Sequence, residues 1–220
     1  MQDENSSSAS ANTAFFCAKI DWTSPGILKI YPEEGPSFFV RDEYVPTLLE
    51  RLVFPNISLT SEDFDTLFLG ARAWLAEKSA MTYLARAEHC RKQLELKLRK
   101  KDFLPSETSY ALDYLESKGY LDDARFCEAW LRSRLLHKAE GPSKLLAALQ
   151  NRGIAYETAK KAVNELFLVN DEETLCQKAI EKLKRRGKSG IKLAVSLNRA
   201  GFSTKLISKY IKSAQRNKDT

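Results

Sequence analysis

The sequence is poor in the residues on which most enzyme sites depend. It has two histidines and four cysteines in 220 residues, and none of the cysteines (Cys17, Cys90, Cys127 and Cys176) forms a C-x-x-C pair. Zinc ligands usually occur as close pairs, so this spacing argues against a metal site. The sequence also lacks G-x-S-x-G and H-E-x-x-H motifs. We therefore expect no enzymatic activity, no cofactor and no metal.

A nucleotide site is also not expected. Gly187-Lys188-Ser189 ends like a phosphate-binding P-loop, but the complete motif needs a glycine where Lys182 stands. It also needs a preceding strand, whereas residues 172–186 follow a helical pattern. We interpret this segment as a turn between two helices.

Other scarcities limit the class of protein. Nine glycines and seven prolines are too few for a low-complexity chain. No apolar run approaches the ~18 residues of a membrane-spanning helix. Residues 1–13 are polar and include Asp3 and Glu4, so a disordered tail is expected where a signal peptide would be apolar. With 43% hydrophobic residues, the chain should form one or two globular domains in the cytoplasm.

The charge is distributed unevenly along the chain. The net charge is +6, but residues 1–70 carry −7, residues 71–174 carry +2 and residues 175–220 carry +11. A basic end of this size favours a polyanionic partner, nucleic acid above all. The alternative is a solvated, lysine-rich surface.

The acidic front has a β pattern followed by a helical one. Short β-type runs at 15–22, 27–31 and 37–40 are separated by Pro- and Gly-containing turns and predict a small antiparallel meander. Asp42 should cap a helix that contains Tyr44, Leu48, Leu49 and Leu52. Thr60-Ser61-Glu62-Asp63 has the pattern of a capping box.

The most informative feature is a threefold repeat. Residues 93–103, 144–154 and 192–202 align without gaps and share leucines four residues apart, on one helix face: Leu94 and Leu98, Leu145 and Leu149, Leu193 and Leu197. Each segment ends in Asp or Gly followed by Phe or Ile, a pattern that can close a helix in the left-handed conformation. A helix is expected before each segment, at 71–87, 122–136 and 171–186, and another after it.

These patterns predict a mainly α fold. Three tandem three-helix repeats, at 71–120, 121–169 and 170–216, should form an elongated curved body. They follow a β-plus-helix region at 14–70 and the tail at 1–13. If the repeats stack in register, their basic residues should form a stripe suited to a polyanion.

The second repeat carries a family resemblance. It contains Leu121-Asp122-Asp123-Ala124-Arg125-Phe126, then Gly141-Pro142-Ser143-Lys144 and finally Asn151-Arg152-Gly153-Ile154. This pattern resembles the RecX family of regulatory proteins, and Leu98-Arg99-Lys100-Lys101-Asp102-Phe103 is similar to the end of that family's first unit. The resemblance covers about residues 71–216. The sequence departs from the pattern at Cys127, where a small Ala is usual.

The resemblance implies a non-enzymatic regulator of recombination and DNA repair. RecX proteins bind in the groove of the filament that the RecA recombinase forms on single-stranded DNA, and they inhibit its growth, ATPase and recombinase activity. The resemblance implies a monomer that binds RecA and single-stranded DNA, with double-stranded DNA as an open alternative. The alternatives are a general DNA-binding protein with helix-turn-helix units and a helical-repeat adaptor that binds only protein.

Residue types indicate which positions make contact. Phe126, Trp130, Leu145, Leu149 and Ile154 are predicted to be core residues, with Asp122 as a helix cap. The candidate residues for contact with DNA or the filament are Arg132, Arg134, Lys138, Lys144, Arg152, Lys184, Arg185, Arg186, Lys188 and Lys192.

Overall fold

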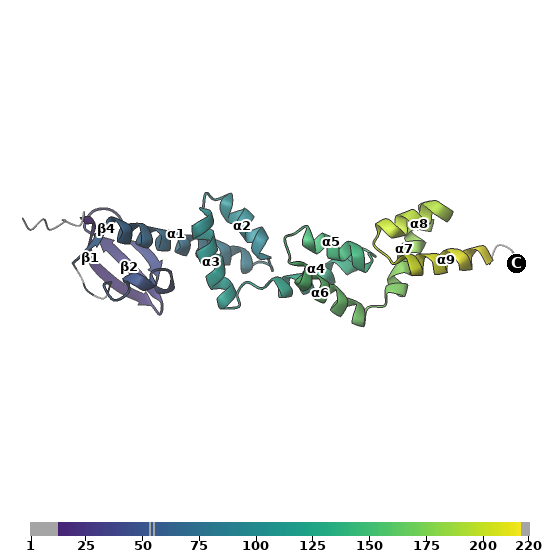
Figure 1. Ribbon diagram of the computed structural model, residues 1–220, viewed down its shortest axis with the longest axis horizontal. Coiled ribbons are helices and arrows are strands. Elements are labelled where there is room, and N and C mark those ends of the chain that lie inside the picture. Colours follow the sequence, from purple (N-terminus) through teal and green to yellow (C-terminus); the bar gives the residue numbers. More distant parts are fainter. Residues whose placement is uncertain (1–12, 53, 55, 217–220) are drawn as a thin grey trace, which may run out of the picture. The chain divides into compact units, whose positions relative to one another are not determined.

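The computed structural model describes residues 13–52, 54 and 56–216, and it is mainly helical with a small antiparallel sheet near the N-terminus (Figure 1). The predicted fold class is therefore confirmed, while the curvature of the body stays a prediction. The tail predicted for residues 1–13 lies outside the described residues except for Thr13, which begins a strand. The chain divides into two compact units. Unit 1 combines the described residues up to Tyr83 with Glu95–Gly119, and unit 2 combines Leu84–Leu94 with those from Tyr120 onward.

The sheet has one strand more than the sequence predicts. Strands β1 (Thr13–Ser24), β2 (Ile27–Pro32) and β3 (Phe38–Arg41) form the expected meander, and β4 (Ile57–Thr60) pairs with β1. The strand order is β3-β2-β1-β4 and every pair is antiparallel. A tight turn joins β1 to β2. Gly26 in this turn has a positive φ of +78°, which glycine adopts without strain.

The prediction of an α-helix after Asp42 is wrong. Two short 3₁₀ turns, η1 (Asp42–Tyr44) and η2 (Pro46–Leu48), occupy this segment. Pro46 has no N–H with which to continue an α-helical hydrogen bond to the Asp42 carbonyl, so the Val45 N–H donates to that carbonyl at 3.0 Å and the turn ends there. The apolar side chains of this segment, including Leu52, still reach the core.

Helix α1 (Ser61–Leu84) begins earlier and ends earlier than the helix predicted at 71–87. The predicted capping box starts it, since the Thr60 N–H donates to Asp63 at 3.0 Å and the Asp63 N–H donates to the Thr60 hydroxyl at 3.2 Å. Gly70 lets α1 approach the sheet region, because a Cβ there would lie 2.8 Å from side-chain carbons of Val40 and Val45.

Eight further helices follow α1 in the described residues. They are α2 (Arg91–Arg99), α3 (Pro105–Ser117), α4 (Asp123–His137), α5 (Pro142–Gln150), α6 (Tyr156–Val169), α7 (Glu172–Lys184), α8 (Gly190–Arg199) and α9 (Thr204–Arg216). The aligned segments contain most of α2, α5 and α8 together with the turns that close them, and each turn includes a residue of positive φ, namely Asp102 (+61°), Gly153 (+88°) or Gly201 (+86°). The left-handed closure predicted from the repeat is therefore confirmed.

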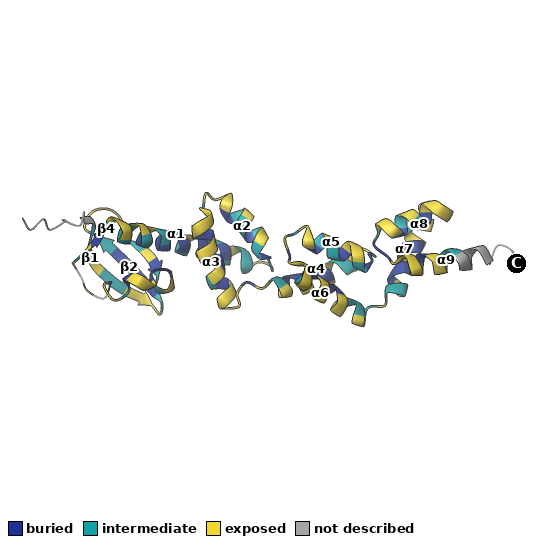
Figure 2. Cartoon of the chain, viewed as in Figure 1, coloured by how far each residue is buried: buried dark blue, intermediate teal, exposed yellow. Residues whose placement is uncertain are grey.

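The repeated leucines belong to the buried cores of the repeats, and Figure 2 shows buried segments alternating with exposed ones along these helices. Leu98, Leu149 and Leu197 have no exposed surface, and of the predicted core residues Phe126, Leu145, Leu149 and Ile154 are buried. Asp122 caps α4 as predicted, because its carboxylate accepts from the N–H groups of Ala124 (2.7 Å) and Arg125 (3.1 Å).

Within unit 2, the second and third repeats are joined through their backbones. The Gly141 N–H donates to the Ala200 carbonyl at 2.8 Å, and the Ser143 N–H donates to the Gly201 carbonyl at 3.3 Å. Two N–H groups at the start of α5 thus donate to carbonyl groups in the turn that closes α8. This contact has no room for a side chain, since a Cβ on Gly201 would overlap the backbone of Lys144.

Candidate nucleic-acid interface

A buried carboxylate organises the basic residues of the second repeat. Glu140, in the loop between α4 and α5, is only 4% exposed. Arg134 in the last turn of α4 donates two hydrogen bonds to it, from Nε at 2.6 Å and from Nη2 at 3.1 Å. Lys144, in the first turn of α5, lies with Nζ 3.1 Å from Oε1 of the same carboxylate. The charged heads of Arg134 and Lys144 are thereby held on one group.

Two opposing effects act on the pKa of Glu140. Burial alone would raise it, but hydrogen bonds from Arg134 and Lys144, together with their positive charges, lower the pKa below its usual value. Glu140 is therefore ionised at neutral pH.

An indole ring extends this cluster. The Arg134 guanidinium lies 5.4 Å from the centre of the Trp130 ring, and that of Arg152 lies 4.4 Å from it. Arg152 also donates to the Ala148 carbonyl at 2.6 Å, which fixes its position at the end of α5. We call Trp130, Arg134, Glu140, Lys144 and Arg152 the Trp130 cluster.

The prediction that Trp130 belongs to the core is only partly right. It packs against the buried core of this repeat but is itself only partly buried. Trp130 precedes Arg134 by four residues, so both lie on one face of α4. That spacing could have indicated the contact. The role of Glu140 has no comparable signal, because it depends on the path of the loop.

The Trp130 cluster is suited to binding an anion. It contains three cations and one carboxylate, and the excess of positive charge lies at a partly exposed surface. Guanidinium groups bind phosphate oxygens well, and an indole ring can stack on a nucleotide base. The arrangement is therefore suited to binding a nucleic-acid backbone and a base.

Two other candidates in the second repeat lie apart from this cluster. Arg132 is exposed and stands two residues before Arg134, which places it on a different side of α4. Lys138, at the end of α4, is exposed with an extended backbone. The structure therefore brings together three of the five candidates in this repeat.

The candidates of the third repeat gather around the turn between α7 and α8. Lys184, Arg185 and Arg186 are exposed at the end of α7, where cations interact favourably with the helix dipole. Arg185 lies 4.0 Å from Glu181, and both side chains are largely exposed. Lys188 donates to the Ser196 hydroxyl at 2.8 Å, and Lys192 is exposed in the first turn of α8.

Other classes of site receive no support from the described residues. No group of three or more His, Cys, Asp or Glu side chains among them could hold a metal ion. No helix in the described part of the chain is both long enough and apolar enough to cross a membrane.

Family models and relatives identify the family to which the helical repeats belong. The model for the RecX second three-helix domain matches residues 122–163, and that for the RecX first three-helix domain matches residues 76–115. The regulatory protein RecX of Treponema pallidum (strain Nichols) is 36% identical over 148 residues, which cover 67% of this chain and 90% of that relative. The chain belongs to the RecX family. The regulatory protein RecX of Halorhodospira halophila is 28% identical over 141 residues.

Solved structures of the RecX family share the fold. A crystal structure of regulatory protein RecX aligns with a TM-score of 0.69 at 19% identity, over 90% of this chain and 99% of that one. The structure of RecX from Lactobacillus salivarius aligns with a TM-score of 0.55 at 25% identity, over 64% of this chain and 96% of that one. The match to the RecX second domain includes the whole Trp130 cluster, whereas the third-repeat candidates follow it in the chain.

Proposed function

We propose that this protein binds the RecA–single-stranded DNA filament in the cytoplasm and inhibits filament growth, ATP hydrolysis and strand exchange. Membership of the RecX family supports a regulatory role, and the resemblance described above supplies RecA as the partner. We expect the protein to act as a monomer and without a cofactor.

The observation that carries this proposal is the Trp130 cluster. Its excess of positive charge is compatible with a filament that contains DNA, and Glu140 holds two of its cations at fixed positions. The exposed cations at the α7–α8 turn add a second basic surface in the same unit. A contact stripe along all three repeats stays a prediction.

The proposal is tested on preformed recombinase filaments on single-stranded DNA. Addition of the protein should slow ATP hydrolysis and shorten the filaments, followed by a coupled assay and by electron microscopy. No effect at a molar excess over the recombinase would contradict the proposal. A sequence-specific footprint on duplex DNA would instead support the helix-turn-helix alternative.

The contribution of the Trp130 cluster is measured with a double variant, Lys144→Ala with Arg152→Ala. Loss of two phosphate contacts should weaken binding to single-stranded DNA and flatten its log–log salt slope by about 1.4 units, or about 0.7 for each contact. The matched control is Lys160→Ala with Lys161→Ala, because these exposed lysines of α6 lie outside the cluster. If the two double variants changed the affinity and the salt slope equally, the Trp130 cluster would not be part of the interface.

A further inference from the structure

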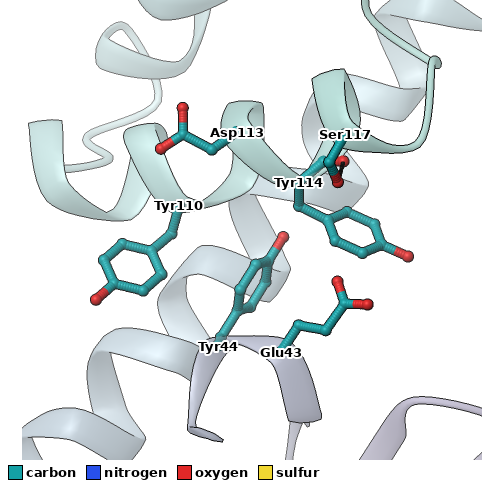
Figure 3. Close-up of a pocket in the computed structure, with 6 residues that line it drawn as sticks. All are labelled: Glu43, Tyr44, Tyr110, Asp113, Tyr114 and Ser117. Atoms are coloured by element: carbon teal, nitrogen blue, oxygen red, sulfur yellow. Dashed lines mark hydrogen bonds between the residues drawn. The ribbon is translucent and has the colours of Figure 1, made fainter.

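Unit 1 contains an aromatic pocket that the proposed function does not use. A pocket of about 310 Å³ lies between η1 and α3, lined by Glu43, Tyr44, Tyr110, Asp113, Tyr114 and Ser117. Figure 3 shows the Tyr44 ring between the rings of Tyr110 and Tyr114, with the Glu43 carboxylate directed toward Tyr114. None of these six lining residues is basic.

The three tyrosines form a fixed set of ring surfaces. Tyr44 packs edge to face with Tyr110 at 6.1 Å and with Tyr114 at 5.9 Å between ring centres. Its hydroxyl donates to Glu77 of α1 at 2.8 Å, which anchors the buried ring. Burial raises the pKa of both Tyr44 and Tyr114, so these phenols stay neutral over the physiological range.

Cations of the chain itself already use these rings. The Arg41 guanidinium lies 3.9 Å from the centre of the Tyr114 ring. The Lys118 ammonium lies 5.3 Å from the same ring and 2.9 Å from the Glu43 carboxylate. Lys118 and Glu43 are both about half exposed, and an ion pair of this kind contributes little stability. An external cation could therefore replace Lys118 beside Glu43 at small cost.

We propose that this pocket binds an arginine side chain of a protein partner. A planar guanidinium can stack on a tyrosine ring while it donates a forked pair of hydrogen bonds to the Glu43 carboxylate. Glu43 and Asp113 would repel a phosphate group. The negative charge of residues 1–70 would attract a basic protein surface to the same unit.

The test uses the full chain and a small probe, N-acetyl-arginine amide, with no recombinase and no DNA. Its outcome is therefore independent of the proposed function. Amide chemical shifts in NMR should change in η1 and α3 in a saturable manner. N-acetyl-citrulline amide, which has the same shape without the charge, should cause no saturable change. Equal responses to the two probes, or arginine shifts confined to other elements, would overturn the proposal.

Variants identify the groups that hold the probe. Tyr110→Ala and Glu43→Gln should each lower the affinity about two- to fivefold, and Lys118→Ala should raise it about twofold by removing the competing cation. Tyr110 and Glu43 are exposed at the pocket rim, so both variants should stay folded, and Tyr110→Ala should lower the melting temperature only slightly, through loss of its ring contact with Tyr44. Tyr120→Ala and Glu50→Gln, at exposed positions outside the pocket, serve as matched controls. Unchanged affinity in Tyr110→Ala and Glu43→Gln would reject the pocket as the site.

Discussion

Each of the two units contains an arginine that forms a forked ion pair with a buried glutamate beside an aromatic ring. In unit 1, Arg41 pairs with Glu77 and also lies 5.0 Å from the centre of the Trp74 ring. In unit 2, Arg134 pairs with Glu140 and lies beside Trp130. The local geometry is similar in the two units.

The charge around each pair differs. In unit 1 the additional partner of Glu77 is the neutral hydroxyl of Tyr44, and the Arg41 side chain is only 11% exposed. In unit 2 the additional partner of Glu140 is Lys144, and the Arg134 side chain is 26% exposed. A forked Arg–Glu pair therefore does not by itself indicate a binding site. The feature that distinguishes the pair in unit 2 is the excess of cations at an accessible surface, and the proposed interface rests on that feature.

The largest effect is expected in unit 1. Glu77→Ala leaves Arg41 buried without its counter-charge, which should lower the free energy of unfolding by about 3–5 kcal/mol. Chemical denaturation measures this, and Glu50→Ala, at an exposed position of the same unit, is the control. A loss below about 1 kcal/mol would show that the pair is no more than a surface ion pair.

The second effect concerns the backbone contact beneath Lys144. Gly201→Ala adds a methyl group that overlaps the Lys144 backbone, whereas Gly187→Ala has a similar φ (+74°) and open space around it. Both variants share the cost of positive φ, so Gly201→Ala should be less stable than Gly187→Ala by about 1–3 kcal/mol. Thermal and urea unfolding of the two proteins provide the comparison. Equal stability would mean that the start of α5 does not need this contact.

A smaller effect is expected at the carboxylate of the Trp130 cluster. Glu140→Gln weakens charge-assisted hydrogen bonds and should cost about 1–2 kcal/mol at pH 7. Because the pKa of Glu140 is lowered by folding, its contribution is present above the unfolded pKa of about 4.3 and is lost as the pH falls through the folded value. The difference between the native protein and the variant should therefore shrink between pH 5 and pH 3 in urea titrations, taken as rough limits. A stability difference that stays constant with pH would mean that the variant loses stability through altered packing and not through the lost carboxylate charge.

The smallest effect on stability is expected at the α7–α8 turn. Arg185→Ala with Arg186→Ala removes exposed cations and should change the free energy of unfolding by less than about 0.5 kcal/mol. The same variant should weaken filament binding and flatten its salt slope, measured by titration at several salt concentrations. An unchanged slope would place both residues on the solvated surface.

Local sequence signals predicted much of the fold. The leucines of α5 and α8, the left-handed glycines that close them, the Asp122 cap and the Thr60–Asp63 capping box are all as expected. Each depends on residues at most a few positions apart, so helical periodicity and capping chemistry suffice. The errors lie where one residue overrides a pattern, as Pro46 does at η1 and η2, or where pairing is distant, as for β4 with β1.

The candidate residues divide in the same way. The RecX-type repeats, the basic C-terminal region and the identity of the candidate cations could be predicted from the sequence, because composition and periodicity are local properties. Helical spacing along α4 also separates Arg132 from Arg134. The meeting of Arg134, Lys144 and Arg152 around Trp130 and a buried Glu140 depends instead on tertiary packing. These groups lie on different elements of the chain. The Glu140 carboxylate and the Trp130 ring can contact all three cations only after α4, the following loop and α5 have packed against one another.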